Sequence, residues 1–417
     1  MKEHVEKTIL DNGVRIITER ITQFRSATIG IWVDVGSLYE EDHNRGMSHF
    51  LEHSLFKGTP TRNAHQIAET MDGIGGNLNA FTEKEQTCFI AKVMDKHIPL
   101  AMEMMGDMLL NAHFPDEEVE KEKNVVLEEI KMYEDSPDEL IFDLLAEACW
   151  KNHPLSLPIL GSAESIRGIK RDTILDFVKD YYTPEQITVA VAGHVKHEDI
   201  VEKVKRYFPF AAGAKSKKKP LGSPQFTSTT VIKEKAIEQV HVCLGMNGVS
   251  QKDDRRHALL ILDTILGGSV SSRLFQEIRE KRGLAYSVTS LQASYGDGAI
   301  FGVYAATAPS NLKTVMNLLK EILSDVRAKG ITKAELKKAK EHLKGVLSLS
   351  FESTSNRMIR LAKGELYHGR FTPHDEVLKK IQAVTLDDVK NVAKDVLQIE
   401  HGTWAVVGQV PDDVTLG

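Results

Sequence analysis

The chain has few cysteines, no excess of positive charge and no long apolar run, and each lack excludes a class of protein. Its cysteines are three isolated residues, Cys88, Cys149 and Cys243, which disfavours a disulfide framework and a cysteine-ligated zinc site. The net charge of −6 gives no sign of a nucleic-acid partner. No apolar run reaches the ~18 residues that a membrane-spanning helix needs, so we expect no membrane partner.

The remaining composition is ordinary for a soluble globular protein. Hydrophobic residues make up 41% and charged residues 27% of the 417 residues, which is enough for two or three domains with a large core. Residues 1–13 read MKEHVEKTILDNG and lack the apolar segment of a secretory signal. Together with the isolated cysteines, this indicates a cytoplasmic protein with reduced thiols.

The most informative stretch is 46–59, which reads GMSHFLEHSLFKGT. On a helix, His49 and His53 project from one face about one turn apart, and Glu52 shares that side. Two neutral imidazoles at this spacing can hold one divalent metal, and zinc accepts imidazole and carboxylate ligands. Glu52 is not needed as a ligand and could take a proton from an activated water. This order of residues is the inverted-zincin pattern.

The alternative for this stretch is an ordinary helix that carries two solvated histidines. Its flanks favour the metal-binding reading. Met47, Phe50 and Leu51 give the helix an apolar side, which can be buried while the histidines on the other side bind a metal. Gly46 before the helix and residues 57–60 after it supply start and stop signals.

Hydrophobic periodicity predicts strands and helices in a similar order in the two halves of the chain. The expected strands are 14–19, 27–35, 77–82, 87–93, 187–192, 230–234, 240–245, 287–294, 299–306 and 403–407. The expected helices, besides the one at the histidines, are 63–71, 97–111, 116–133, 137–149, 173–182, 195–207, 255–266, 272–281, 311–328, 333–350, 353–367 and 386–397.

An internal repeat predicts two homologous domains. The stretch ITVAVAGHV at 187–195 resembles GTWAVVGQV at 402–410, and each follows a predicted helix that starts near a threonine. We therefore expect a first domain at 1–210, a linker at 211–224 and a second domain at 225–417. The lysines in the linker favour a solvated connection over a nucleic-acid patch. The second domain lacks the metal-binding residues, because its helix 255–266 carries only His257.

A third protein ligand is expected from the acidic helix 116–133. Glu122 and Glu129 are seven residues apart, so they stack on one face two turns apart. One of them could ligate the metal while the other supports a ligand histidine, and the spacing leaves open which does which. The alternative is that the carboxylates form a solvated helix face, which we expect for Glu117, Glu118 and Glu120.

Five stretches together resemble the pitrilysin family of inverted-zincin metallopeptidases, in its mitochondrial-processing-peptidase-like branch. They read GMSHFLEHSLFKGT (46–59), GGNLNAFTEKEQT (75–87), EKEKNVVLEEIKMYEDSPDEL (120–140), ILGSAESI (159–166) and GGSVSSRLFQEIREKRGLAYSV (267–288). The resemblance covers both halves. It implies an α+β fold of two homologous domains, each a mainly antiparallel sheet flanked by helices. Ser54 departs from the methionine common in the family, away from the expected chemistry.

The resemblance also implies roles around the metal. His49 and His53 match the two ligand histidines, and Glu52 matches the general base. Glu129 matches the third ligand by its distance from His53, and Glu122 matches the acidic residue that supports the site. The implied cofactor is one Zn²⁺ per chain.

Residues that hold substrate are implied in both halves. Asn79, Ala80 and Phe81 match an edge strand that pairs with an extended peptide. In the second half, Arg282 and Tyr286 match the family's substrate-binding arginine and tyrosine; four residues apart, they could share the end of a helix. Their alternative roles are an ordinary ion pair and a core tyrosine.

The expected function is a zinc-dependent endopeptidase that cleaves peptides or unfolded segments inside a dimer chamber, using metal-activated water and a glutamate base. Because one chain carries both the metal residues and the Arg282–Tyr286 pair, the resemblance favours a homodimer over a heterodimer with a metal-free partner. Such a partner would carry an extended glycine-rich loop, and 267–269 is too short for one. The rival from another class is a non-catalytic assembly subunit of the same family.

Overall fold

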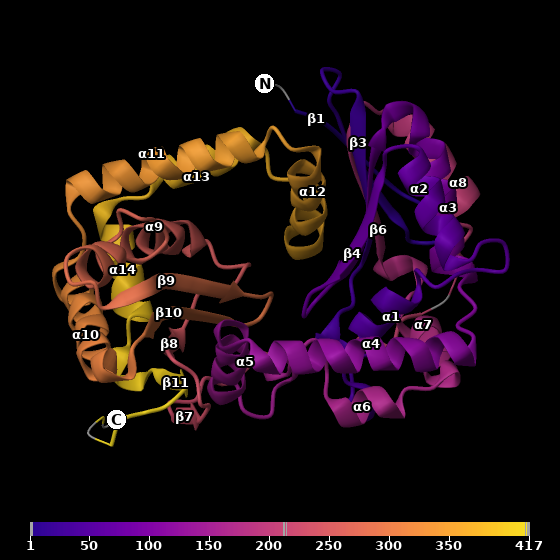
Figure 1. The fold of residues 1–417 in the computed structure, drawn as a ribbon. Coiled ribbons are helices and arrows are strands. Elements are labelled where there is room, and N and C mark those ends of the chain that lie inside the picture. Colours follow the sequence, from indigo (N-terminus) through magenta and orange to yellow (C-terminus); the bar gives the residue numbers. More distant parts are fainter. Residues whose placement is uncertain (1–2, 212, 214, 413, 415–417) are drawn as a thin grey trace. The chain divides into compact units, whose positions relative to one another are not determined.

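The computed structural model describes residues 3–211, 213, 215–412 and 414, and their contacts divide the chain into two compact units (Figure 1). The first unit comprises the described parts of 1–130, 158–220 and 349–373. The second comprises those of 131–157, 221–348 and 374–417. Each unit thus contains segments from both halves of the sequence. The expected division at 211–224 stays a prediction, and its residues 212 and 214 lie outside the described residues.

The first unit is built on a six-stranded sheet in the order β1-β2-β6-β3-β5-β4. Its β2–β6 pair is parallel and every other pair is antiparallel. The strands are β1 His4–Ile9, β2 Arg15–Arg20, β3 Ser26–Val33, β4 Asn77–Thr82, β5 Thr87–Met94 and β6 Ile187–Gly193.

Both faces of this sheet are covered. Successive side chains of a strand point to opposite sides, so one strand contributes residues to two cores. From β3, Ile29 and Ile31 enter the larger core, whereas Trp32 enters a smaller core with Met358 of helix α12. Figure 1 shows α12 on one side of the sheet and α2, α3 and α8 on the other. The helices are α1 Met47–Ser54, α2 Ala64–Gly73, α3 Ile98–Asn111, α4 Asp116–Asp135, α6 Ala163–Gly168, α7 Arg171–Tyr181, α8 His197–Tyr207 and α12 Thr354–His368.

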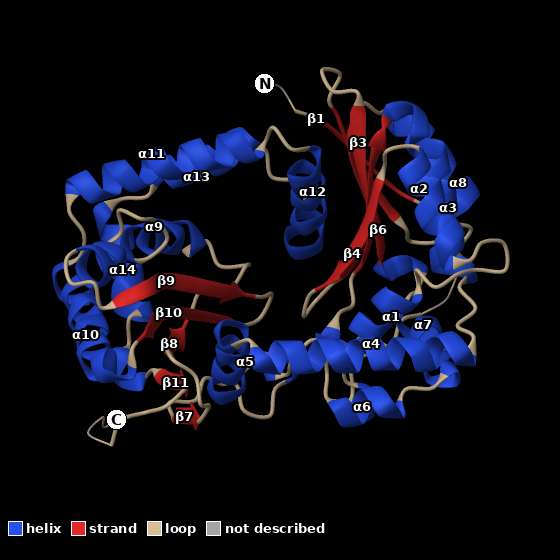
Figure 2. Ribbon diagram, in the orientation of Figure 1, coloured by secondary structure: helices blue, strands red, loops and turns tan. Residues whose placement is uncertain are grey.

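The second unit has a five-stranded sheet in the order β7-β11-β8-β10-β9 (Figure 2). Its strands are β7 Thr230–Lys233, β8 Val240–Asn247, β9 Ala285–Ser294, β10 Ala299–Thr307 and β11 Thr403–Val407. Its helices are α5 Pro137–Cys149, α9 Arg256–Leu266, α10 Leu312–Lys329, α11 Lys333–Ser350, α13 His374–Ala383, α14 Leu386–Val396 and a π-helix at Phe275–Glu280. Helix α4 leaves the first unit at residue 130, and α11 returns to it at residue 349.

The two sheets share one topology. The order β2-β6-β3-β5-β4 has the same succession of one parallel and three antiparallel pairs as β7-β11-β8-β10-β9. The predicted fold class, two similar α+β domains with mainly antiparallel sheets flanked by helices, is confirmed. In the part of the chain that the structure describes, no helix combines the length and apolar character needed to cross a membrane.

Among the strands and α-helices of the described residues, three escaped the sequence analysis, namely β1, α6 and α13. β1 is an edge strand whose charged residues hide its alternation, and α6 has only six residues. We have no comparable reason for α13. The helix expected at 272–281 is present mainly as the π-helix, whose wider turn depends on tertiary contacts that periodicity does not reveal.

A buried ion pair fastens α12 to the first sheet. Arg357 of α12 donates to the carboxylate of Glu19 in β2, and these residues are only 7% and 1% exposed. Arg357→Met should therefore lower the free energy of unfolding by about 3–5 kcal/mol, because Glu19 would be left buried without this partner. Urea denaturation followed by circular dichroism measures this loss.

The matched control for this prediction is Arg25→Met, whose exposed guanidinium pairs with Asp95 at the surface. It should change the unfolding free energy by less than ~1 kcal/mol. Equal losses in the two variants would contradict the structural importance of the buried pair.

Candidate metal centre

Helix α1 carries the histidine motif, and a buried carboxylate holds its first turn. The helix begins after Gly46, whose φ of 86° lies in the left-handed region that glycine adopts at least cost. The backbone N–H groups of Gly46 and Ser48 donate to the carboxylate of Glu40, at 2.6 and 2.7 Å. This acceptor satisfies N–H groups that a helix otherwise leaves unpaired, while burial raises the pKa of Glu40 to about 7.

The apolar side of α1 fixes the direction of its histidines. Met47, Phe50 and Leu51 are fully buried in the larger core of the first unit. This packing sets the rotation of the helix about its axis. The rings of His49 and His53 then lie one turn apart on the other side, with centroids separated by 4.5 Å.

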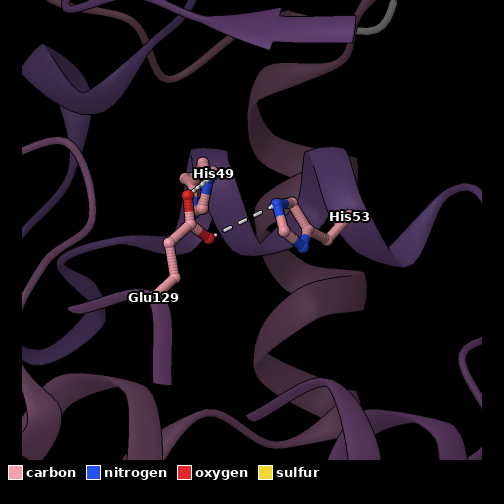
Figure 3. A group of neighbouring side chains, drawn as sticks. All are labelled: His49, His53 and Glu129. Carbon is pink, nitrogen blue, oxygen red and sulfur yellow. Dashed lines mark ion pairs between the residues drawn. The ribbon is translucent and has the colours of Figure 1, made fainter. Parts of the chain in front are cut away.

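Glu129 of α4 completes a group of three possible ligands with these histidines (Figure 3). Its carboxylate oxygens lie 3.7 Å from Nε2 of His49 and 3.8 Å from Nε2 of His53. Ligand atoms around a tetrahedral zinc, with bonds of about 2.1 Å, lie roughly 3.4 Å apart. The three side chains therefore fit a zinc ion after small rotations. Among the described residues, this is the one group that could hold a metal.

The two histidines differ in their protonation tendencies, and that of His49 suits a metal ligand. Burial, helped by the neighbouring His53, lowers the pKa of His49 to about 4, so its imidazole is neutral and free to ligate at neutral pH. For His53, the hydrogen bond to Glu122 raises the pKa above its ordinary value. A bound cation would oppose this protonation.

Glu122 fixes the orientation of His53 by binding its Nδ1, the ring nitrogen that does not face Glu129. It is 2% exposed, and its carboxylate bonds Nδ1 of His53 at 2.7 Å and Nζ of Lys57 at 2.6 Å. Burial opposes ionisation, but the hydrogen bonds from His53 and Lys57 hold the pKa of Glu122 below its ordinary value. With Nδ1–H bound to a carboxylate, Nε2 of His53 is left to face Glu129.

Glu52 lies where α1 meets strand β4. Its Oε2 accepts a hydrogen bond of 2.5 Å from the hydroxyl of Thr82, the last residue of β4. Burial raises the pKa of Glu52 above its ordinary value. The carboxylate thus stands at one end of a strand that forms the edge of the sheet.

The edge strand β4 includes the three residues expected to hold a peptide. Asn79 is exposed, whereas Ala80 and Phe81 are half-buried. The side-chain oxygen of Asn79 accepts from the backbone N–H of Ala80 at 2.8 Å. The ring of Phe81 packs edge-on against Trp32 at 5.4 Å.

Comparison with known proteins decides the family. Residues 15–163 match the model described as insulinase (peptidase family M16), and residues 168–343 match the peptidase M16 inactive domain. A Bacillus subtilis protein named as an uncharacterized zinc protease is 42% identical over 94% of this chain and 95% of its own length. The chain belongs to the M16, or pitrilysin, family. A Streptomyces coelicolor protein with the same description is 40% identical over 98% of this chain and 90% of its own length.

Solved structures agree on the fold of this M16 chain. A protease from Helicobacter pylori superposes with a TM-score of 0.90, covering 98% of this chain and 100% of its own, at 23% identity. A Pseudomonas fluorescens protein, described as a peptidase M16 inactive domain, gives a TM-score of 0.92 over 99% and 100% at 19% identity. At such identities the likeness establishes the fold alone.

Arg282 and Tyr286 lie in the second unit of the M16 chain. Arg282 follows the π-helix and donates to the backbone carbonyl and carboxylate of Glu277, at 2.8 and 2.6 Å. Tyr286 lies in β9, so the expectation of a shared helix end is wrong. Its side chain is 76% exposed, with the guanidinium of Arg279 over its ring at 4.7 Å. It is therefore not a core tyrosine.

Sequence reasoning gave no role in the site to three residues that contact α1 or Glu122, namely Glu40, Lys57 and Thr82. Lys57 lies beyond the end of α1 at Ser54 and contacts Glu122, so helical spacing gave no signal for it. Glu40 and Thr82 contact α1 from other elements, so spacing along the sequence gave no signal for them. The structure brings Glu129 between the histidines and Glu122 behind His53, while the roles of all these residues stay predictions.

A binding experiment tests the roles of the two glutamates. Glu129→Gln should weaken zinc binding by at least about tenfold, because the variant loses an anionic ligand. Glu122→Gln should weaken it by roughly 10–100-fold through His53 alone. A zinc titration against a competing chelator measures both. The control is Glu120→Gln on the exposed side of α4, which should bind like the unaltered chain. Unchanged binding by Glu129→Gln would contradict its assignment as a ligand.

Proposed function

We propose that this M16 chain is a zinc-dependent endopeptidase that cleaves extended peptides or unfolded segments. The observation that carries the proposal is the meeting of His49, His53 and Glu129 beside Glu52, which stands at the end of an open strand edge. When bound by these three side chains, zinc would supply a Lewis acid that polarises the scissile carbonyl and acidifies water.

Glu52 acts as the proton carrier in this proposal. It takes the proton from the attacking water and passes it to the nitrogen of the leaving amine. Thr82 donates to Oε2 and so holds the carboxylate in place. Burial raises the pKa of Glu52, which favours uptake of the proton from water.

Strand β4 selects an extended backbone. A peptide added along its edge would make main-chain hydrogen bonds beside Asn79, Ala80 and Phe81, with little demand on side-chain identity. Such pairing explains a preference for unfolded segments over folded proteins, because a folded protein rarely offers a free strand.

The three cysteines are free and buried, which agrees with a reducing, cytoplasmic location.

The resemblance to the family further supports a homodimer with one zinc per chain. In this proposal each active site takes Arg282 and Tyr286 of the partner subunit to hold the substrate carbonyl or the developing oxyanion. The high exposure of Tyr286 supports a role in contacting another molecule.

Cleavage of a quenched fluorescent peptide tests the catalytic proposal. Glu52→Gln should lower kcat by roughly 10²–10⁴-fold, because it removes the proton acceptor, while zinc content stays unchanged. Glu120→Gln is the control and should cleave normally. Full activity in Glu52→Gln would contradict its role. A zinc-loaded, inactive parent chain would favour the non-catalytic subunit or a requirement for a different partner.

Mixing inactive variants tests the shared site. The chains Glu52→Gln and Tyr286→Phe should each cleave poorly alone. A mixed dimer would have one site with an intact Glu52 and an intact Tyr286 of the partner subunit. Random exchange should therefore restore about one quarter of the parent activity. A mixture that regains nothing would contradict the sharing of residues between protomers.

A further inference from the structure

We propose that helix α12 positions the peptide-binding edge of the first unit, with Tyr367 as the positioning residue that fixes the turn between β4 and β5. This turn comprises residues 83–86, and α12 comes from the distant stretch Thr354–His368. The inference rests on the proposed function, because it takes β4 as the strand that receives the substrate. It adds a named element that holds this strand in register.

The helix is a firm support because it is anchored along its whole length. Near its start, the hydroxyl of Thr354 lies 2.8 Å from that of Thr28 in β3. The indole N–H of Trp32 points to the sulfur of Met358 at 3.2 Å. Near its end, the carboxylate of Glu365 forms an ion pair with the ammonium of Lys7 at 2.5 Å. Arg357 adds the buried pair described above, so α12 has little freedom to move on the sheet.

Two side chains of α12, one helical turn apart, reach the β4–β5 turn. The Tyr367 hydroxyl donates to a carboxylate oxygen of Glu85 at 2.6 Å and lies 3.4 Å from the side-chain oxygen of Gln86. The Lys363 ammonium lies 2.7 Å from the carboxylate of Glu83. Both bonds to the glutamates involve a charged group, so each is stronger than an ordinary neutral hydrogen bond.

Helix α12 also supports strand β4 through the side chains packed between them. Phe81 of β4 packs on Trp32, and Trp32 packs on Met358 of α12. Gly30 lets the methionine approach, because a Cβ there would lie 2.2 Å from its sulfur. The turn and the adjoining end of the edge strand therefore rest on one helix. Thr82 at the end of β4 also binds Glu52, so a shift of the turn would reach the proposed base.

The contacts from α12 stabilise an edge strand that has a neighbouring strand on one side only. In the described sheet β4 pairs with β5 alone, so its outer hydrogen-bonding groups stay open for a peptide. A strand held on one side only frays more readily than a central strand. Contacts from α12 stabilise the hairpin through side chains and leave that outer edge free. Tyr367 can thereby improve peptide binding without touching the peptide.

The test compares Tyr367→Phe with Tyr207→Phe, using zinc-loaded full-length chains. Among the described residues, the Tyr207 hydroxyl makes no hydrogen bond, so this variant controls for loss of a hydroxyl. Tyr367→Phe should lower kcat/KM about fivefold, mostly through KM. Hydrogen–deuterium exchange of 77–90 should become faster, with zinc content and melting temperature nearly unchanged. Tyr207→Phe should match the parent chain in every measurement.

A double variant separates positioning from general loosening. If Tyr367 acts through Glu85, adding Glu85→Ala to Tyr367→Phe should cost little beyond the single change. An unchanged KM with unchanged exchange in Tyr367→Phe would overturn the inference while leaving the proposed function intact. A zinc-loaded parent chain that cleaves no peptide would instead count against the proposed function. In that case peptide binding to β4 is measured by fluorescence anisotropy, and equal affinity in Tyr367→Phe overturns the inference.

Discussion

The candidate site depends on the buried carboxylate of Glu122, which joins two helices that are far apart in the sequence. It binds His53 and Lys57, both from the segment around α1, while belonging to α4 itself. This contact fixes the position of α4 along its axis relative to α1. Because Glu129 lies two turns farther along α4, the same contact brings its carboxylate opposite both imidazoles. One side chain thus sets a histidine tautomer and the position of a third ligand.

A second constraint is that α1 must be held while its polar side stays open. Three fully buried side chains, those of Met47, Phe50 and Leu51, hold its apolar side. Glu40 holds its first turn through two backbone hydrogen bonds. The histidines therefore meet a prospective metal in a geometry that the surrounding protein already determines. Preorganisation of this kind lowers the cost of ordering the ligands when the metal binds.

Much of this site could be predicted, because it follows from local spacing. The separation of His49, Glu52 and His53 places them on one side of a helix whatever the rest of the fold does. The choice between Glu122 and Glu129 was different. Their seven-residue spacing makes them equivalent on the face of α4, and only the resemblance to a family assigned their roles.

The remainder depends on tertiary contacts that no local pattern contains. Periodicity predicted that the residues of α12 form a helix, but not that Met358 packs on Trp32 of the first sheet. The strand β1 was missed because its half-exposed, charged sequence lacks a clear alternation. Tyr286 was expected at a helix end and lies in a strand, because the chain leaves the π-helix at residue 280 and β9 begins at residue 285.

The most direct test of the central claim is a crystal structure of the zinc-loaded protein with anomalous diffraction recorded at the zinc absorption edge. The account predicts one strong peak per chain, ligated by Nε2 of His49, Nε2 of His53 and the carboxylate of Glu129, with Glu122 bonded to His53 behind it. A peak elsewhere, or zinc ligated by Glu122 with Glu129 turned away, would contradict it.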